Sequence, residues 1–149
     1  MIELREVTAA DYDEVVALWQ ASEGIVLRAV DERAPLERYL AHNPRLSFVA
    51  CDGARVVGAV LCGTDGRRGY LQHLAVAATH RRQGIGRRRA ECAVAALASR
   101  GIAKCHLMVL PANVAARTFW KRLGWAERTD VLLMSHVMSH VRDGSNPDI

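Results

Sequence analysis

Residues 70–89 limit what this 149-residue chain can fold into more than any other stretch. They read YLQHLAVAATHRRQGIGRRR, a short apolar strand and a polar turn that opens through Gly84 and Gly86 into a helix. The first N–H groups of a helix lack internal partners, and the helix dipole adds partial positive charge there. The glycines leave room for a phosphate, and full charges come from Arg81, Arg82, Arg87, Arg88 and Arg89. The stretch therefore predicts a diphosphate site where a helix follows a strand.

The spacing of the glycines narrows the choice of diphosphate. A dinucleotide-binding turn reads Gly-x-Gly-x-x-Gly, but Arg89 occupies the position of the third glycine. A P-loop needs a Gly-Lys-Ser or Gly-Lys-Thr, which this sequence does not contain. What remains is Arg81-x-x-Gly84-x-Gly86 after Leu-Ala-Val. This pattern resembles the pyrophosphate-binding motif of the GNAT superfamily of acyl-CoA-dependent N-acyltransferases.

A second motif, farther along the chain, resembles the same superfamily. The usual motif is Asn-x-x-Ala-x-x-Phe-Tyr-x-x-Leu-Gly-Phe, and the matching positions here are Asn113, Ala116, Phe119, Trp120, Leu123, Gly124 and Trp125. Two motifs in the right order and at the right separation are far more specific than either alone. The chain is therefore identified as a member of the GNAT superfamily. Residues 57–60 and the turn at 63–69 are also similar to the small bacterial YpeA-type acetyltransferases.

The composition is typical of one soluble globular domain. Half of the residues are hydrophobic and 24% are charged, and the chain is long enough to bury a core. No apolar run approaches the eighteen or so residues of a membrane span, and the first residues lack a signal-peptide core, so a cytoplasmic location is expected. The four cysteines lie far apart and are expected to be small buried hydrophobes: Cys51, Cys62, Cys92 and Cys105.

The net charge of +4 raises the alternative of a nucleic-acid binder. Five of the basic residues fall within residues 81–89, however, and such clustering favours a compact anionic ligand over a long polyanion. Neither nucleic acid nor a membrane is expected as a partner. No metal is expected either, because the i, i+4 pair His136 and His140 lacks the glutamate of a zinc helix.

Hydrophobic periodicity and turn residues predict one domain at residues 1–138 and a polar, flexible tail at residues 139–149. With the resemblance, they predict an α/β (α+β) GNAT fold, a mixed and mostly antiparallel sheet of about seven strands flanked by four helices. Strands are expected at residues 2–7, 46–51, 55–62, 70–76, 104–110, 125–130 and 132–137. Helices are expected at about residues 8–22, 31–41, 84–99 and 113–123.

The resemblance implies acetyl-CoA as co-substrate and assigns residues to it. Backbone groups at positions 74–76 are expected to pair with the pantetheine arm, and the Val76 N–H to polarise the thioester carbonyl. Arg82 to Arg87 are expected to wrap the pyrophosphate, while Arg88 or Arg89 lies on a solvated helix face. The full expected set is Leu74, Ala75, Val76, Arg81, Arg82, Gln83, Gly84, Ile85, Gly86, Arg87, Asn113, Ala116 and Phe119.

The implied reaction is transfer of an acetyl group to a primary amine, on a small molecule or a protein, by direct nucleophilic attack. A lysine-like amine is only about 0.1% neutral at pH 7.4, so a base is expected to assist. The first candidate catalytic group is Tyr70 and the second is His73, and alternation along a strand puts their side chains on opposite faces. Asp65 is expected to stabilise its turn.

The superfamily's usual general acid is a tyrosine, and its position holds Trp120, whose indole N–H cannot replace a phenol. A non-catalytic acyl-CoA-binding or regulatory module therefore stays open as the alternative. If Trp120 is a core residue, the substitution says nothing about activity. The resemblance also allows a homodimer, because GNAT proteins are commonly dimers.

Overall fold

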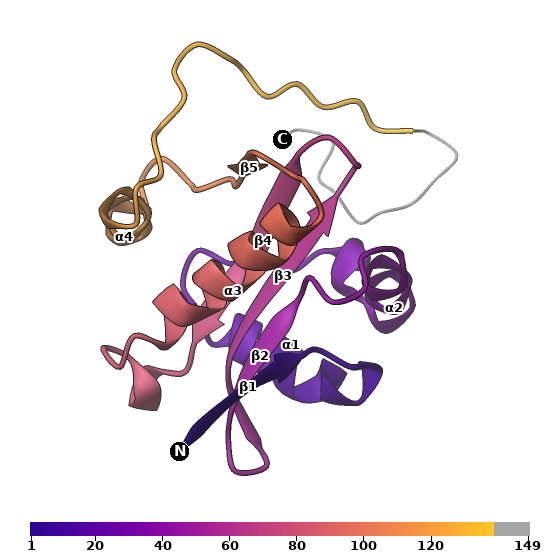
Figure 1. The fold of residues 1–149 in the computed structure, drawn as a ribbon, viewed down its shortest axis with the longest axis vertical. Helices are drawn as coiled ribbons and strands as arrows, with labels where there is room; N and C mark the ends of the chain where they lie inside the picture. Colours follow the sequence, from indigo (N-terminus) through magenta and orange to yellow (C-terminus); the bar gives the residue numbers. More distant parts are fainter. Residues whose placement is uncertain (139–149) are drawn as a thin grey trace.

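The chain forms a five-stranded sheet with helices on both faces (Figure 1). A computed structural model of the protein describes residues 1–138. The sheet order, β1-β2-β3-β4-β5, follows the sequence. The strands are β1 (Ile2–Glu6), β2 (Phe48–Asp52), β3 (Arg55–Thr64), β4 (Gly69–Val76) and β5 (Cys105–His106). Strands β1 to β4 pair antiparallel and β5 is parallel to β4, as predicted for a meander followed by a helical crossover.

Four α-helices occur in the described part of the chain, as predicted. They are α1 (Tyr12–Gln20), α2 (Arg33–His42), α3 (Ile85–Ser99) and α4 (Val114–Arg122). Short 3-10 turns precede the first three: η1 (Ala9–Asp11), η2 (Ala29–Asp31) and η3 (Ala78–His80). Helices α1 and α2 cover one face of the sheet, whereas α3 and α4 pack on the other (Figure 1). The predicted fold class is therefore confirmed.

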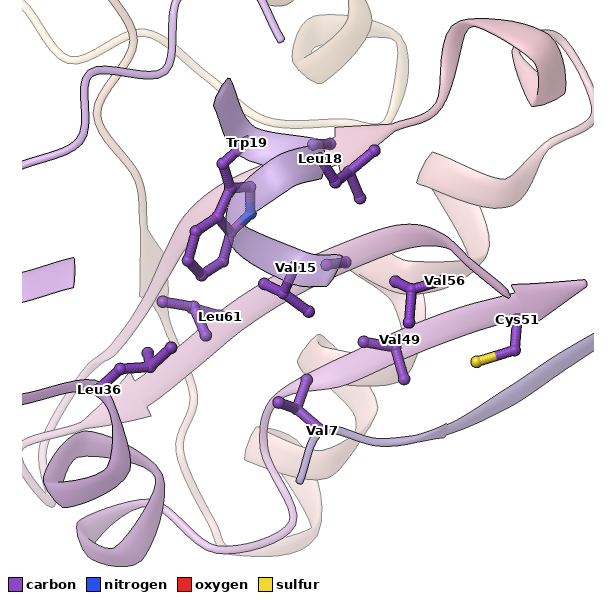
Figure 2. Close-up of a cluster of buried hydrophobic side chains, with 11 residues drawn as sticks. Val7, Val15, Leu18, Trp19, Leu36, Val49, Cys51, Val56 and Leu61 are labelled. Carbon is purple, nitrogen blue, oxygen red and sulfur yellow. The ribbon is translucent and has the colours of Figure 1, made fainter. Parts of the chain in front are cut away.

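A hydrophobic cluster fills the space between the sheet and helix α1 (Figure 2). Val15 and Trp19 are four residues apart, so they share one face of the helix, and both are fully buried. They pack with Val49 of β2 and Leu61 of β3. Helix α1 lies mainly over β3, and Trp19 also reaches β4, the strand that carries the candidate catalytic residues.

The four cysteines are free thiols. Cys51 and Cys62 are buried, whereas Cys92 and Cys105 are half-buried. Burial raises the pKa of the Cys62 thiol to about 12 and that of Cys105 to about 11, so both stay protonated at neutral pH. The prediction of small hydrophobes is confirmed for the two buried cysteines, one on β2 and one on β3.

The C-terminal part of the sheet is shorter than predicted, with five strands in place of about seven. Only Cys105–His106 of the predicted strand 104–110 pairs with β4, and residues 125–138 form no strand. That segment extends away from the sheet (Figure 1), and Leu132 and Met134 are 91% and 90% exposed. A two-residue β5 is too short an edge to hold a hairpin, which alone is marginally stable. The predicted tail lies outside the described residues.

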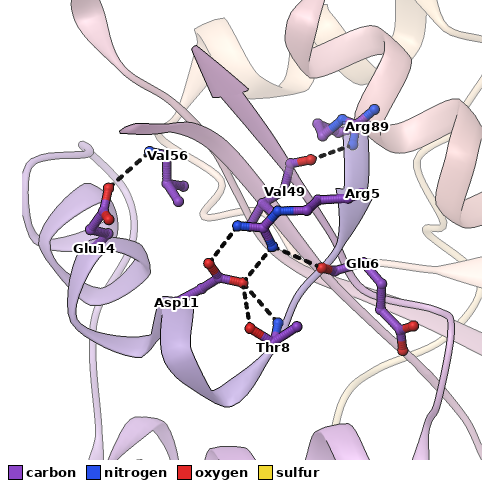
Figure 3. Close-up of polar contacts among 8 residues, drawn as sticks. All are labelled: Arg5, Glu6, Thr8, Asp11, Glu14, Val49, Val56 and Arg89. Carbon is purple, nitrogen blue, oxygen red and sulfur yellow. Dashed lines mark hydrogen bonds and ion pairs between the residues drawn. The ribbon is translucent and has the colours of Figure 1, made fainter. Parts of the chain in front are cut away.

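A cluster of polar contacts joins β1 to the start of α1 (Figure 3). The Arg5 guanidinium donates hydrogen bonds to both Asp11 carboxylate oxygens, at 2.8 and 2.7 Å. The Thr8 N–H and hydroxyl also donate to Asp11, at 2.8 and 3.1 Å. These bonds, that from Arg5 above all, hold the pKa of Asp11 below its usual value although burial opposes them. The helix start predicted at about residue 8 is confirmed, with Thr8 and Asp11 forming a capping box.

Asp11→Asn is expected to lower the free energy of unfolding at pH 7 by about 1–3 kcal/mol, because hydrogen bonds to a charged group contribute about that much. A carboxyl whose pKa is lowered in the folded state stabilises the fold above the unfolded pKa of about 3.9. That contribution is lost as the pH falls through the folded pKa. Urea denaturation at pH 7, 4 and 2.5 measures the difference between the two proteins. An equal difference at all three pH values would contradict this account.

Candidate active site

A β-bulge in β4 shapes the site. Leu61 of β3 pairs with Gln72 and Ala59 with Ala75, so a single β3 residue faces both His73 and its neighbour Leu74. His73 has a φ of 55°, in the left-handed region that few residues other than glycine adopt. The Trp19 indole N–H donates to the His73 carbonyl at 2.8 Å, which satisfies a backbone oxygen that the bulge removes from the ladder. The buried indole therefore holds the bulge in place.

The bulge reverses the alternation of side chains along β4. Leu71 packs in the cluster under α3, yet Ala75, four residues later, packs in the cluster under α1. Gln72 and Tyr70 line pockets against α2, and His73 also faces that side. The prediction that Tyr70 and His73 lie on opposite faces is therefore wrong. One extra residue in the strand places both on the side of α1 and α2.

His73 forms a pair with Asp31 at the end of η2. The His73 Nε2 and Asp31 Oδ1 atoms are 2.9 Å apart, and the His73 ring lies 4.9 Å from the Trp19 ring. Burial alone raises the pKa of Asp31, but hydrogen bonds from His73 and from the Arg28 N–H outweigh it and lower the pKa. An ionised Asp31 can only accept, so Nε2 carries a hydrogen, and in the neutral form of the ring the lone pair is on Nδ1.

Two adjoining pockets lie beside this pair. The first has a volume of about 300 Å³ and is lined by Val30, Asp31, Pro35, Leu36, Arg38, Tyr39, His42, Asn43, Leu61 and Gln72. The second, of about 240 Å³, is lined by Tyr39, Asn43, Gly63, Thr64, Asp65, Tyr70 and Gln72. Tyr39, Asn43 and Gln72 belong to both, so the pockets share a wall.

Tyr70 lies at the outer end of the second pocket. Its side chain is exposed, its hydroxyl is 3.5 Å from the Asp65 carboxylate, and its ring is 5.9 Å from that of His106. Asp65 accepts hydrogen bonds from the N–H groups of Arg67 and Arg68, both at 2.8 Å. These two bonds lower the pKa of Asp65 and close its turn. The structure therefore gives Asp65 the turn-stabilising role that the sequence predicted.

The start of α3 has the backbone geometry of an anion site. Arg82 and Gly84 both have left-handed backbones, with φ of 64° and 74°, and Ile85 begins the helix. A left-handed residue followed by a helical one turns successive N–H groups into a shared concavity that binds anions. Gly84 adopts this conformation without a Cβ clash. Arg81, Arg82 and Arg87 are exposed around it, and Arg87 also pairs with Glu91 at 2.7 Å.

Of the two arginines predicted as alternatives for a solvated helix face, Arg88 is exposed, whereas Arg89 is not. Its side chain is fully buried, and its Nη1 donates to the Val49 carbonyl at 2.8 Å (Figure 3). The position is four residues after Ile85 and four before Ala93, which are both buried on the core face of α3. Burial lowers the pKa of Arg89, which has no carboxylate partner among residues 1–138.

The outer edge of β4 is open beyond its first residues. Strand β5 pairs only with Gly69 and Tyr70. The Ala77 N–H donates to the Val57 carbonyl of β3 at 2.8 Å. Successive N–H groups along a strand point to opposite edges, so the Val76 N–H points to the open edge. The Arg81 Nε reaches the Val76 carbonyl at 3.4 Å, which brings that arginine to the same edge.

Helix α4 meets the end of β4 and the start of α3. A Cβ on Gly86 would lie 3.5 Å from Val76 Cγ2 and 3.6 Å from Phe119 Cζ. The Asn113 side chain caps α4 by accepting from the Ala116 N–H at 3.1 Å, and it lies against Gly24. The structure thus brings Val76, Gly86 and Phe119 together. Asn113 has a structural role at the helix start, whether or not it also contacts a ligand.

Two other positions of the motifs are core residues. Ile85 is 1% exposed, so only its backbone is open to a ligand. Trp120 is 9% exposed and packs edge-on against Phe119 and Trp125, with ring centroids 5.0 and 5.1 Å away. The substitution of the usual tyrosine by Trp120 therefore fills the core at this position. The remaining predicted positions, Leu74, Ala75, Gln83 and Ala116, lie on the β4 edge, the turn and α4.

Residues 1–138 contain neither a metal cluster nor a membrane-spanning helix. No group of three or more His, Cys, Asp or Glu side chains there is arranged to hold a metal ion. His140, one half of the rejected zinc pair, lies outside the described residues. No helix in the same part of the chain is both long and apolar enough to cross a bilayer.

Sequence comparisons agree with the two motifs. The profile of the Acetyltransferase (GNAT) family matches residues 12–125. An acetyltransferase of Sodalis glossinidius is 33% identical over 134 residues, which cover 89% of this chain and 93% of that protein. An acetyltransferase of Yersinia enterocolitica is 30% identical over 133 residues, with coverage of 89% and 93%.

Solved structures share the arrangement of strands and helices. The ribosomal-protein-S18-alanine N-acetyltransferase of Escherichia coli superposes with a TM-score of 0.73 at 22% identity, covering 87% of this chain and 80% of that one. The PaiA N-acetyltransferase of Thermoplasma acidophilum, solved in complex with coenzyme A, gives a TM-score of 0.74 at 17% identity, covering 83% and 88%. At these identities the similarity concerns the fold.

Proposed function

The chain belongs to the GNAT family of acetyltransferases, which transfer acyl groups from acetyl-CoA, and we propose that it acetylates a primary amine with His73 as general base. The observation that carries the proposal is the bulge in β4. It turns the His73 side chain toward Asp31, which lines the first pocket, and it turns the Val76 N–H to the open strand edge. A proton acceptor and a backbone donor therefore lie on one short segment.

The residues around the start of α3 fit acetyl-CoA. The left-handed backbone at Arg82 and Gly84 and the exposed arginines suit a pyrophosphate. The open edge at Leu74, Ala75 and Val76 suits the amide groups of a pantetheine arm. Phe119 and the remaining motif positions Gln83, Ile85, Gly86, Arg87, Asn113 and Ala116 would surround these groups. When bound, acetyl-CoA supplies the acetyl group as an activated thioester.

Each protein group has a separate part in the proposed reaction. The His73 Nδ1 takes the proton of the acceptor ammonium, which makes the nitrogen a nucleophile. Asp31 holds the ring through Nε2 and stabilises the imidazolium that forms. The Val76 N–H donates to the carbonyl oxygen under attack. The C–S bond breaks without a protein acid, because a thiol with a pKa of about 8.5 departs as thiolate at neutral pH, and this thiolate takes the second proton that the nitrogen loses as the amide forms.

Coenzyme A binding to Gly86→Asp tests the binding half of the proposal. A Cβ at Gly86 would make only ordinary van der Waals contact with Val76 and Phe119, so the fold is expected to survive, but the new carboxylate would add a negative charge beside the proposed pyrophosphate site. The Kd for coenzyme A is expected to rise about 100-fold, a loss of about 2.7 kcal/mol. Isothermal titration calorimetry measures it. The matched control is Arg88→Gln, which removes a charge from the same helix and is expected to change the Kd less than about threefold.

Thiol release from acetyl-CoA across a panel of primary amines tests the catalytic half. Amine-dependent release above the hydrolysis rate supports acetyl transfer. Tight coenzyme A binding without release from any amine would instead support a non-catalytic binding module. A Kd for coenzyme A that is unchanged in Gly86→Asp would show that the start of α3 does not contribute to coenzyme A binding.

A further inference from the structure

The wall of the first pocket has groups of opposite charge. Asp31, which pairs with His73, is an ionised carboxylate, whereas Arg38 and His42 line the pocket from successive turns of α2. Asp31 ends η2, Glu32 is extended, and α2 begins at Arg33, so one extended link and five residues of helical rise separate Asp31 from Arg38, on the order of 10 Å. A pocket of about 300 Å³ with this polarity suits a small molecule with a positive and a negative end.

Arg38 has no ion-pair partner among residues 1–138. Its neighbour on the same helix, Arg33, is paired with Asp13 at 3.1 Å and lies 4.5 Å over the Tyr12 ring. Glu37 also lies within 3.8 Å of Arg33. The structure thus neutralises Arg33 on the outside of α2 and leaves the Arg38 guanidinium, which lines the pocket, available to an anion.

Tyr39, the next residue of α2, supplies a second donor that has no partner. It lines both pockets, and its hydroxyl is a buried atom without a hydrogen-bond partner in the described chain. Burial raises the pKa of this phenol, so it stays protonated and can donate. Buried polar groups are almost always hydrogen-bonded, and an anion in the pocket would supply the acceptor that Tyr39 needs, after a small shift of the ring.

An acceptor with a second cationic group in place of the anionic group would fit the two pockets less well. Asp65, in the second pocket, is the carboxylate that would receive a second ammonium. Its Oδ1 already accepts from two backbone N–H groups at 2.8 Å, and these belong to Arg67 and Arg68, whose positive side chains flank it. The charges around the two pockets therefore disfavour a diamine.

We propose that the acceptor is an amine that also carries a carboxylate about 10 Å away, as in a short peptide, with the carboxylate bound by Arg38 and Tyr39. This inference rests on the proposed amine acetylation and names its substrate class. The amine end lies beside His73 and Asp31, and the carboxylate end beside α2. An extended tripeptide, at about 3.3–3.6 Å per residue, spans the distance.

Three probes at fixed acetyl-CoA test the inference: triglycine, triglycinamide and 1,5-diaminopentane. Thiol release is expected to give a kcat/KM for triglycine about tenfold above that for triglycinamide, the value of one charge-assisted contact. In Arg38→Gln that ratio is expected to fall to about twofold or less, with the KM for acetyl-CoA unchanged. In Tyr39→Phe the KM for triglycine is expected to rise about 3- to 10-fold without a loss of thermal stability.

Two control variants separate recognition from folding. Arg33→Gln removes the paired arginine of the same helix and is expected to keep the tenfold ratio. Tyr12→Phe removes a hydroxyl that donates to the Asp31 carbonyl at 2.9 Å, and it is expected to lower the melting temperature, unlike Tyr39→Phe. This contrast identifies the Tyr39 hydroxyl as one that the folded chain leaves without a partner.

The inference is overturned if triglycinamide or 1,5-diaminopentane is used as well as triglycine, or if Arg38→Gln keeps the wild-type ratio. Thiol release with triglycinamide or 1,5-diaminopentane alone would still support amine acetylation, but it would contradict recognition of a carboxylate on the acceptor. No release with any of the three probes also overturns the inference. In that case amine acetylation is judged separately, by the broad amine panel and by coenzyme A binding.

Discussion

Replacing His73 with asparagine is expected to lower kcat roughly 10²- to 10⁴-fold, the contribution of a positioned base. The KM for acetyl-CoA is expected to stay within about twofold, because no predicted contact to that substrate involves the imidazole. Asparagine is the suitable replacement since residue 73 has a φ of 55°, and asparagine tolerates left-handed backbone better than alanine does. Its amide can still donate to Asp31 but cannot take up a proton at neutral pH.

The pH dependence of kcat/KM distinguishes a catalytic base from a structural residue, because loss of a purely structural residue would leave the shape of the pH profile unchanged. The variant's rate is expected to rise about tenfold per pH unit up to the pKa of the amine, because only the neutral amine then reacts. Asp31→Asn, which keeps the imidazole, is expected to lower kcat less than His73→Asn does. Tyr70→Phe is the control for the other candidate, and it is expected to stay within about threefold of wild type. A larger fall in Tyr70→Phe than in His73→Asn would move the catalytic role to Tyr70.

The sequence predicted the turn and helix start at Gly84 because a short segment of the chain determines them. Gly84 lies close to the arginines before it, and Asn113 caps the helix that begins at the next residue by accepting from the Ala116 N–H. Such signals need no knowledge of tertiary packing. The meander and the crossover helix were predicted for the same reason, since turn residues and apolar periods lie within each element.

The His73–Asp31 pair was not predicted because it depends on contacts between distant parts of the chain. The partners are 42 residues apart, and a bulge that no turn residue announces orients the imidazole. Strand alternation is a dependable rule only until one residue is inserted, after which every later side chain changes face. The one sequence signal was Asp31 itself, which stands at the predicted start of the second helix.

The other differences between prediction and structure also arise where packing outweighs a local rule. Arg89 is charged, so composition alone places it in solvent, but its spacing from Ile85 and Ala93 puts it on the buried stripe of α3. Residues 125–138 are apolar enough for strands, yet a strand also needs an edge with which to pair, and β5 offers two residues. The hydrophobic periodicity of a short sequence segment cannot predict whether a strand edge is available for pairing.

Trp19→Phe is expected to lower the free energy of unfolding by about 2–4 kcal/mol, the sum of a lost hydrogen bond to a buried carbonyl and of the space left by the smaller ring. Trp19 is fully buried, and its indole N–H is the donor to the His73 carbonyl at 2.8 Å. Without that donor the His73 carbonyl is left unsatisfied, and it would be more stable if it accepted a hydrogen bond within the β-ladder. That change would straighten the bulge. Because the bulge orients His73, we expect kcat to fall as well, by about 10-fold or more.

Urea denaturation and thiol release measured on the same preparation separate the two effects. Trp125→Phe is the matched control, because Trp125 is half-buried against Trp120 and its indole N–H makes no hydrogen bond within residues 1–138. That control is expected to cost about 1 kcal/mol of stability and to leave kcat unchanged. If Trp19→Phe were as unstable as expected yet fully active at a temperature where it stays folded, the bulge would not depend on this hydrogen bond. Asp31 alone would then have to orient His73. In that case Asp31→Asn would lower kcat more than Trp19→Phe does.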